Sequence, residues 1–386
     1  MAPREERIVM TNIREVRVSL HERERPFVTG RAATQFGVLT IVTESGIEGT
    51  VFVGGAQTSP AIVTKALADI VRPQLIGLDA LDIGAIWAKL WPQERMLSTV
   101  AIGAVDTALW DILGKVAGLP IHRLLGTVRH SIPAYISSWN HDRPEDYAAE
   151  ALHYKSLGFT AYKFHPPTQA RTFKGIDVPL SEDIRTARLV REAVGPEMRL
   201  MHDSPRVYTY EEALTMGKAL EELDYYWYED PLPADDIYGY ERLRKQLHIP
   251  ILATEMTGGG PYNYAQWILH GATDYLRGDV AFKGGITALT KIAHTAEVFR
   301  LGFEIHDGFN ATGNVAGAHV AMASPNAQYF EILTVQDTGV YGFDNFGYGL
   351  AEPLEIVGGR VLAPSGPGLG RAIDHDLINS GIIATF

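Results

Sequence analysis

The stretch of sequence from 199 to 255 decides the fold: RLMHDSPRVYTYEEALTMGKALEELDYYWYEDPLPADDIYGYERLRKQLHIPILATE. It contains three short apolar runs that each carry an acidic residue at or near their end, and two helical segments separate them. Thr209 followed by Glu212 forms a capping-box pattern, which marks the start of the first helix. Short buried strands that alternate with amphipathic helices indicate a parallel sheet covered by helices.

The same alternation continues on both sides of this stretch. Eight strand-like runs follow one another: IPAYISSW (132–139), AYKFH (161–165), RLMHD (199–203), YYWYED (225–230), ILATE (251–255), YLRGD (275–279), FEIHD (303–307) and YFEIL (329–333). Eight strand–helix units in about 200 residues predict an α/β protein built on a (β/α)₈ barrel, the TIM barrel.

The N-terminal part has a different pattern. Strand-like runs at 13–20, 36–43 and 47–53 precede several helices, of which 100–117 has the clearest apolar stripe. These residues predict an α+β unit in front of the barrel. The tail from about 351 is rich in Gly and Pro, includes a short hairpin-like piece, and must pack on the first unit or run free.

Composition restricts the classes of protein that are possible. The 386 residues are 46% hydrophobic and 21% charged, which is typical of a globular protein with a sizeable core. The net charge of −12 argues against nucleic-acid binding, and the lack of cysteine excludes disulfides and thiolate zinc sites. We expect a cytoplasmic protein, because the N-terminus does not resemble a signal peptide and no apolar run is long enough to cross a membrane.

Polar residues stand at the end of nearly every predicted barrel strand. They are Lys163 and His165, Asp203, Glu229, Glu255, Asp279, His306 and Glu331. From Asp203 onward they are 24 to 27 residues apart, which is one strand–helix unit. Because barrel active sites lie at the carboxyl ends of the strands, we expect these side chains to converge.

The three carboxylates Asp203, Glu229 and Glu255 come from adjacent strands. Buried carboxylates that lie close together repel one another unless a cation holds them, and ligand sets made only of oxygen suit Mg²⁺. The sequence therefore predicts a magnesium site. The alternative is three separate acids, each paired with a nearby Lys or Arg.

The remaining residues suggest proton transfer. Asp279 and His306 lie on neighbouring strands, where a carboxylate can orient an imidazole as a general base; the alternative is an ordinary hydrogen-bonded core histidine. Lys163 and His165 are two residues apart, so both point into the barrel mouth, as bases or as an anion site. Glu331 is either a protonated acid that donates to substrate or the salt-bridge partner of a lysine.

Two nearby residues are assigned no catalytic role. His202 neighbours Asp203 on a strand, so its side chain points the other way. Lys283 precedes a Gly-Gly turn into a helix and is interpreted as structural.

This set of groups predicts a reaction. A divalent ion stabilises the enediolate that forms when the carbon next to a carboxylate loses its proton, and bases stand on opposite sides of the metal. Two other classes remain open: a metal-independent glycosidase that uses Glu229 and Glu255, and a sugar-acid binding protein without turnover.

The quoted motifs, together with AIGAVDTALWDILGKVAGLPIHRLLG (101–126) and PSGPGLG (364–370), resemble the enolase superfamily, mandelate racemase subgroup, over essentially the whole chain. The resemblance implies a modified barrel (129–350) under an α+β cap made of the N-terminal segment (1–128) and the returning tail (351–386). Two cap loops, about 21–35 and 52–59, would close the site and set its specificity.

The resemblance also assigns roles. Asp203, Glu229 and Glu255 match the ligands of one Mg²⁺, Asp279 and His306 the dyad base, and Glu331 the acid that binds the substrate carboxylate. Lys163 matches the first lysine of a Lys-x-Lys motif whose second lysine is here His165. Pro205 stands where the family often has Asn, and Arg206 or Tyr208 is a candidate to replace that polar contact.

Acid-sugar dehydration to a 2-keto-3-deoxy acid is the commonest outcome in this subgroup and is the activity that the resemblance favours. The close alternative is a racemase, epimerase or sugar-lactone cycloisomerase that uses the same residues. The expected partner is a small carboxylate substrate, and the resemblance implies a homo-oligomer.

Overall fold

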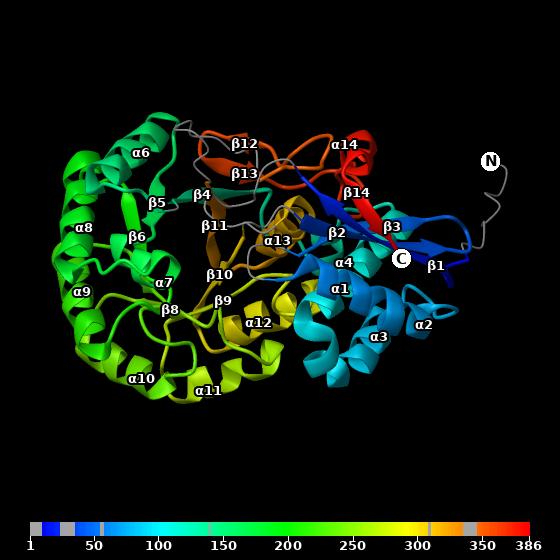
Figure 1. Ribbon diagram of the computed structural model, residues 1–386, viewed down its shortest axis with the longest axis horizontal. Coiled ribbons are helices and arrows are strands. Elements are labelled where there is room, and N and C mark those ends of the chain that lie inside the picture. Colours follow the sequence, from blue (N-terminus) through cyan, green and yellow to red (C-terminus); the bar gives the residue numbers. More distant parts are fainter. Residues whose placement is uncertain (1–9, 24–34, 55–57, 139, 308–309, 335–345) are drawn as a thin grey trace.

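The computed structural model describes residues 10–23, 35–54, 58–138, 140–307, 310–334 and 346–386. Figure 1 shows a barrel surrounded by helices on one side and a smaller sheet with its own helices on the other. The small sheet has the order β14-β1-β2-β3 and is antiparallel. Its strands are β1 (Ile13–Glu22), β2 (Gln35–Thr43), β3 (Glu48–Val53) and β14 (Ile382–Thr385).

The tail of the chain returns to the N-terminal sheet. Thr385 of β14 pairs with Ser19 of β1, and the two strands lie side by side in Figure 1. On the way, the hairpin β12 (Ile356–Val357) and β13 (Arg360–Leu362) pairs with the first barrel strand. The cap that the resemblance implies is therefore confirmed, whereas the boundaries at 128 and 350 stay a prediction.

The cap helices pack against both the small sheet and the barrel. They are α1 (Pro60–Ala66), the π-helical turn η1 (Leu67–Val71), α2 (Arg72–Leu75), α3 (Ile83–Leu90), the 3₁₀ turn η2 (Trp91–Gln93) and α4 (Glu94–Ala117). Gly103 of α4 lies so close to the barrel loop after β9 that an added Cβ would come within 2.5 Å of the Val280 carbonyl oxygen. A larger side chain at position 103 would therefore push the cap helix away from the barrel.

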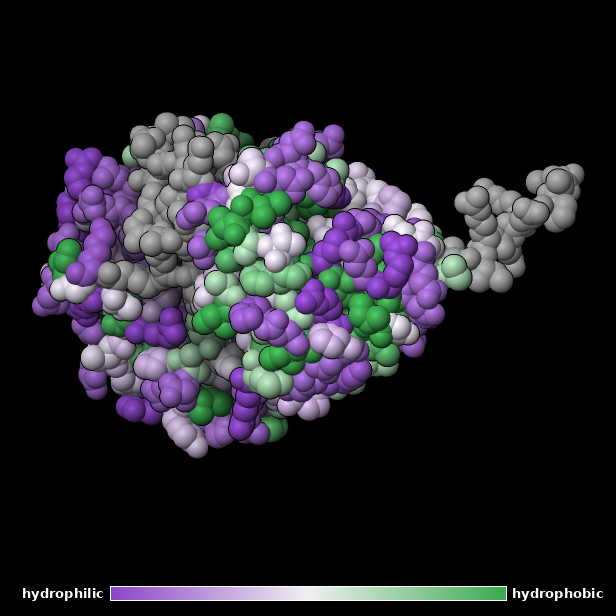
Figure 2. All heavy atoms as spheres, turned by 45° about the vertical axis from the view of Figure 1, so that its right-hand side comes forward, coloured by the Kyte–Doolittle hydropathy of each residue, from purple (hydrophilic) through white to green (hydrophobic). Residues whose placement is uncertain are grey.

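Helix α4 begins earlier than predicted. Our prediction started at 100, but the helix runs from Glu94, with a break at Ser98, whose φ is 64°. The stretch Ile83–Ala117 is long and apolar enough to cross a membrane, but most of it is buried inside the protein, as expected of a core helix. The face shown in Figure 2 mixes hydrophilic and hydrophobic residues.

The barrel has all eight predicted strands. They are β4 (Ser131–Ser138), β5 (Ala161–Phe164), β6 (Arg199–Asp203), β7 (Trp227–Glu229), β8 (Ile251–Ala253), β9 (Tyr275–Gly278), β10 (Gly302–Ile305) and β11 (Ala327–Leu333). Neighbours pair in parallel, and Phe330 of β11 pairs with Ala134 of β4 to close the ring. The (β/α)₈ prediction is confirmed.

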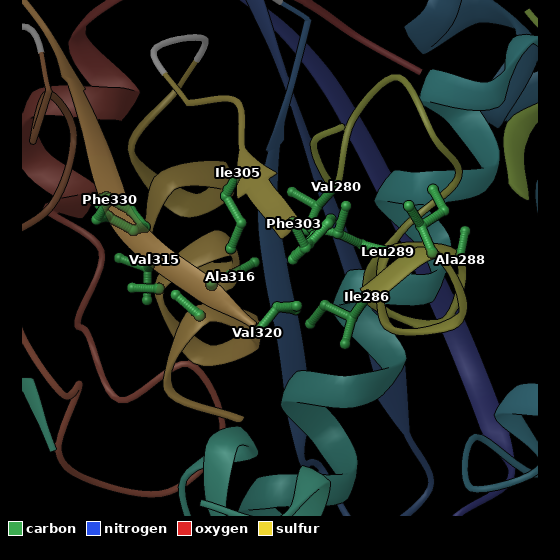
Figure 3. Packing of buried hydrophobic residues seen from close by; sticks show 14 of the residues in the cluster. Val280, Ile286, Ala288, Leu289, Phe303, Ile305, Val315, Ala316, Val320 and Phe330 are labelled. Atoms are coloured by element: carbon green, nitrogen blue, oxygen red, sulfur yellow. The ribbon is translucent and has the colours of Figure 1, made fainter. Parts of the chain in front are cut away.

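Helices cover the outside of the barrel. They are α5 (Ile121–Leu125), α6 (Pro144–Ser156), the 3₁₀ turn η3 (Pro167–Gln169), α7 (Ala170–Lys174), α8 (Leu180–Val194), α9 (Tyr210–Glu222), α10 (Ile237–Gln246), the 3₁₀ turn η4 (Gly260–Tyr262), α11 (Tyr264–Leu269), α12 (Ile286–Val298) and α13 (Ala311–Ala323); α14 (His375–Ser380) belongs to the tail. The predicted capping box at Thr209 is present. Figure 3 shows Phe303 and Ile305 of β10 packed among apolar side chains of α12 and α13.

The inside of the barrel has an apolar layer and a charged layer. The apolar layer consists of Tyr135, Ala161, Met201, Trp227, Leu252, Tyr275 and Tyr329. On five strands the residue two positions further along is charged and buried: Lys163, Asp203, Glu229, Arg277 and Glu331. Because strand side chains alternate, these residues point inward as well, one level closer to the barrel mouth.

Candidate active site

The structure joins all eight predicted site residues in one network of ion pairs. Lys163 connects Asp203, Glu229 and Glu331, and His165 lies against Asp203. The network continues through a residue that the sequence analysis did not select, Arg277, to Glu255, His306 and Asp279. The predicted convergence at the carboxyl ends of the strands is therefore confirmed.

Lys163 is fully buried among carboxylates. Its Nζ lies 2.8 Å from Asp203 Oδ2, 2.9 Å from Glu229 Oε2 and 2.9 Å from Glu331 Oε1. Burial and the neighbouring Arg277 oppose its charge, but the three carboxylates outweigh them and raise the pKa of Lys163 well above its usual value. The ammonium is thus a fixed positive charge in this arrangement.

His165 is held in one orientation by a backbone carbonyl of the neighbouring strand β4. Its Nδ1 lies 2.5 Å from the Ser138 carbonyl oxygen, which can only accept, so Nδ1 carries a proton. Its Nε2 lies 3.2 Å from Asp203 Oδ2. Burial would lower the pKa of His165, but Asp203 and the Ser138 carbonyl raise it above its usual value.

His306, which follows β10, is held like His165, with one ring nitrogen on a fixed oxygen and the other directed at a predicted metal ligand. Its Nδ1 lies 3.0 Å from Asp279 Oδ2, and its Nε2 lies 3.4 Å from Glu255 Oε1. Asp279 is itself fixed, because its Oδ1 accepts a hydrogen bond from the Phe282 N–H at 2.6 Å. Burial opposes the imidazolium, but Glu255 and Asp279 raise the pKa of His306.

Arg277 is the residue that sequence reasoning missed. It lies on β9, is fully buried, and its Nε is 2.5 Å from Glu229 Oε1 and 3.0 Å from Glu255 Oε2. A signal was available: Arg277 comes two residues before Asp279 in the predicted strand 275–279, so the alternation of side chains predicts that both point into the barrel.

Glu331 is an ion-pair partner, which is one of the two readings that its spacing left open. Its oxygens accept hydrogen bonds from Arg277 Nη2 at 2.6 Å and from the Asp307 N–H at 3.1 Å, and Lys163 Nζ is 2.9 Å away. Burial raises the pKa of Glu331, but Arg277 and Lys163 outweigh it and lower the pKa below its usual value. Its contact with a substrate carboxylate stays a prediction.

The carboxylate set fits a magnesium ion in its chemistry. Asp203 and Glu229 pair in register across β6 and β7, and all donors are oxygen. Among the described residues, the buried Glu229 Oε1 accepts no hydrogen bond, because the nearby Arg277 N–H points at Glu255. As the side chains stand, no three described His, Asp or Glu residues converge closely enough to hold an ion, since Lys163 and Arg277 hold the carboxylate oxygens.

Three further predictions concern the loops around the site: the roles of Tyr208 and Arg206, and the two cap loops. Tyr208 donates to Asp183 Oδ2 at 2.5 Å in a buried cluster away from the barrel interior, so it does not take the place of an Asn side chain at position 205. Arg206 is exposed, has a φ of 62°, and lines a cleft of about 540 Å³ with residues that follow Glu255. Most of the two predicted cap loops, at 24–34 and 55–57, lies outside the described residues.

The two residues that were assigned no catalytic role are buried outside the network. His202 lies between the rings of Phe164 and Tyr228, and burial lowers its pKa to about 3. Lys283 Nζ donates to the carbonyl oxygens of Thr254 at 3.0 Å and Thr257 at 2.8 Å. It therefore supports the turn that carries Glu255, as a structural lysine does.

Comparison with known proteins identifies the protein family to which this barrel belongs. Residues 10–126 match the "Mandelate racemase / muconate lactonizing enzyme, N-terminal domain", and residues 146–377 match "Enolase C-terminal domain-like". The chain belongs to the mandelate racemase/muconate lactonizing enzyme family of the enolase superfamily.

Its relatives are dehydratases and cycloisomerases. The chain is 34% identical to D-galactarolactone cycloisomerase of Agrobacterium fabrum over 84% of this chain and 86% of that one. It is 30% identical to arabinonate dehydratase of Saccharolobus solfataricus over 81% of each chain. The crystal structure of D-glucarate dehydratase from Agrobacterium tumefaciens with magnesium superposes with a TM-score of 0.87, at 29% identity, over 97% of this chain and all of that one.

Proposed function

We propose that this protein is a Mg²⁺-dependent acid-sugar dehydratase that removes the proton next to the substrate carboxylate. One observation carries the proposal: two histidines face the carboxylate set from opposite sides. Each has Nδ1 fixed by an oxygen, Ser138 O for His165 and Asp279 Oδ2 for His306. Each directs Nε2 toward a predicted metal ligand, which leaves two proton-transfer groups across one site.

Asp203, Glu229 and Glu255 would hold one Mg²⁺. When bound, the ion supplies a charge that binds the substrate carboxylate and stabilises the negative charge formed on proton loss. Lys163, which is itself paired with Glu331, positions the ligands Asp203 and Glu229 through its ion pairs. Fixed donors and charges of this kind cost no reorganisation during the reaction.

The two histidines divide the proton transfers. One takes the proton from C2, and the other gives a proton to the hydroxyl that leaves C3, so one water is lost for each substrate. The enol product then takes a proton at C3 and becomes a 2-keto-3-deoxy acid. Asp279 keeps His306 in the tautomer that a base requires, and Ser138 does the same for His165.

A cycloisomerase acting on a sugar lactone is the second candidate. The cycloisomerase relative at 34% identity favours it. It would begin with the same proton transfer, but the dehydratase releases one water for each substrate, whereas the cycloisomerase releases none.

The test is proton NMR in D₂O, with Mg²⁺ or EDTA, on four- to six-carbon sugar acids, diacids and their lactones. A new C3 methylene signal that depends on Mg²⁺, in a product lighter than its substrate by one water, establishes the dehydratase, whereas the same signal without loss of water establishes a lactone cycloisomerase. Exchange of the C2 proton or a ring change without that methylene moves the assignment to the racemase, epimerase or cycloisomerase alternative. Turnover that survives EDTA would contradict the metal role and support the glycosidase alternative.

Two proposals about the whole protein go with this function. We propose a homo-oligomer, which the molar mass from light scattering tests, and a cytoplasmic location, which fractionation tests.

A further inference from the structure

Arg277 contacts three carboxylates of the network at once. Besides Glu229 and Glu255, its Nη2 lies 2.6 Å from Glu331 Oε2, and its Nη1 donates to Tyr135 Oη at 3.0 Å. The guanidinium group offers five N–H donors in a rigid plane, so one side chain can address several carboxylates in different directions.

Arg277 and Lys163 act as a pair. Glu229 has Oε1 next to Arg277 and Oε2 next to Lys163. Glu331 has Oε2 next to Arg277 and Oε1 next to Lys163. Two acids on separate strands, β7 and β11, are thus each held at both oxygens by the same two cations.

The charges of this cluster do not balance. With all four carboxylates ionised and His165 and His306 neutral, the acids Asp203, Glu229, Glu255 and Glu331 and their two permanent cations leave two negative charges. In that state the surplus equals the charge of one divalent ion. A cation that touches two of the three predicted metal ligands lowers the attraction of the site for Mg²⁺. When Mg²⁺ is not bound, the same cation lowers the repulsion among the acids.

We propose that Arg277 is a positioning residue whose fixed positive charge holds the ligand carboxylates together and keeps the Mg²⁺ affinity of the site moderate. This inference depends on the proposed magnesium site, because it assigns a role toward that ion. It differs from a purely structural role, in which the loss of Arg277 would destabilise the barrel and leave metal binding unchanged or weaker.

The experiment measures Mg²⁺ binding by isothermal titration calorimetry, and the melting temperature (Tm) with and without Mg²⁺, after EDTA dialysis. Arg277→Met removes the charge and keeps most of the length of the side chain. We expect Mg²⁺ to bind Arg277→Met about tenfold more tightly or better, because a like charge next to the ion is gone. We also expect the Tm without metal to fall by about 10 °C, and Mg²⁺ to restore part of this loss.

Arg277→Lys separates charge from shape. It keeps the charge and loses the planar fork, so its Mg²⁺ affinity should stay within about threefold of the wild type. Glu304→Gln is the matched control, because it changes a buried acid that pairs in register with Arg277 and makes no ion pair among the described residues. Its Mg²⁺ affinity should be unchanged. Arg277→Gln is neutral and polar, and replaces Arg277→Met if that variant does not fold.

Unchanged or weaker Mg²⁺ binding by the neutral variant would overturn the inference. A gain in Mg²⁺ affinity in Arg277→Lys as large as the gain in Arg277→Met would also overturn the inference, because the charge of residue 277 would then not be the cause. If the wild type binds no Mg²⁺, the proposed metal site fails and the inference fails with it. Normal wild-type binding without a gain in the neutral variant rejects the inference alone.

Discussion

The two layers inside the barrel are built on the same strands and are only two residues apart, but they are held together in different ways. The apolar layer, with Trp227 and Tyr275, is stabilised by packing that needs no particular direction. The charged layer, with Glu229 and Arg277 directly after them, is stabilised by ion pairs whose charges must compensate. The first layer therefore belongs to stability and the second to function.

The largest effect is expected from breaking the charged layer at Lys163. Lys163→Met leaves three carboxylates without their shared cation, and breaking a buried ion pair by removal of one partner costs about 3 to 5 kcal/mol of folding free energy. We expect catalysis to fall by about a thousandfold or more as well. Calorimetric unfolding and the NMR assay measure the two losses. Lys155→Met is the control for catalysis, because Lys155 donates to the Val194 carbonyl oxygen, outside the network. Near-normal stability and turnover of Lys163→Met would refute the idea of a charge-balanced layer.

The next largest effect is expected from substitution of the two histidines. These substitutions leave both buried cations of the charged layer in place, so they test proton transfer separately from charge balance. His306→Asn and His165→Gln should each lower dehydration by about a hundredfold to ten-thousandfold. The variant that still exchanges the C2 proton with D₂O has lost the acid, and the one that does not has lost the base. Dehydration at the wild-type rate by either variant would remove that histidine from the mechanism.

Breaking the apolar layer should have a different outcome. Trp227→Leu replaces a fully buried indole with a smaller side chain and should cost about 2 kcal/mol of folding free energy through the cavity that remains. The affinity for Mg²⁺ should stay the same, because Trp227 lies one level below Glu229. Denaturant unfolding and calorimetry check both points, and a large loss of Mg²⁺ affinity would show that the layers are not independent.

The sequence was sufficient for the order of the strands, because it follows from periodicity along the chain. The predicted strands 251–255 and 303–307 run two residues past the observed ends at Ala253 and Ile305. The sequence was not sufficient for Arg277, since its role depends on acids from β7, β8 and β11 that come together only in the closed barrel. The choice between the two readings of Glu331 required Arg277 as well. The early start of α4 was missed because the break at Ser98 interrupts the helical pattern.

Glu304 gives the smallest effect and tests whether an acid buried next to the charged layer needs a cation. It is buried on β10 in register with Arg277, its Oε1 accepts a hydrogen bond from the Gln328 N–H, and burial raises its pKa to about 8. The folded protein therefore keeps the Glu304 proton to higher pH than the unfolded chain, whose pKa is near 4.5. Its contribution to stability is complete below about pH 4.5 and is lost as the pH rises toward 8. Between pH 5 and 8 the Tm of the wild type should fall relative to that of Glu304→Gln by about 2 to 4 °C. Parallel curves over that range would mean that Glu304 is ionised and that Arg277 on the neighbouring strand compensates its charge, which would extend the charged layer to β10.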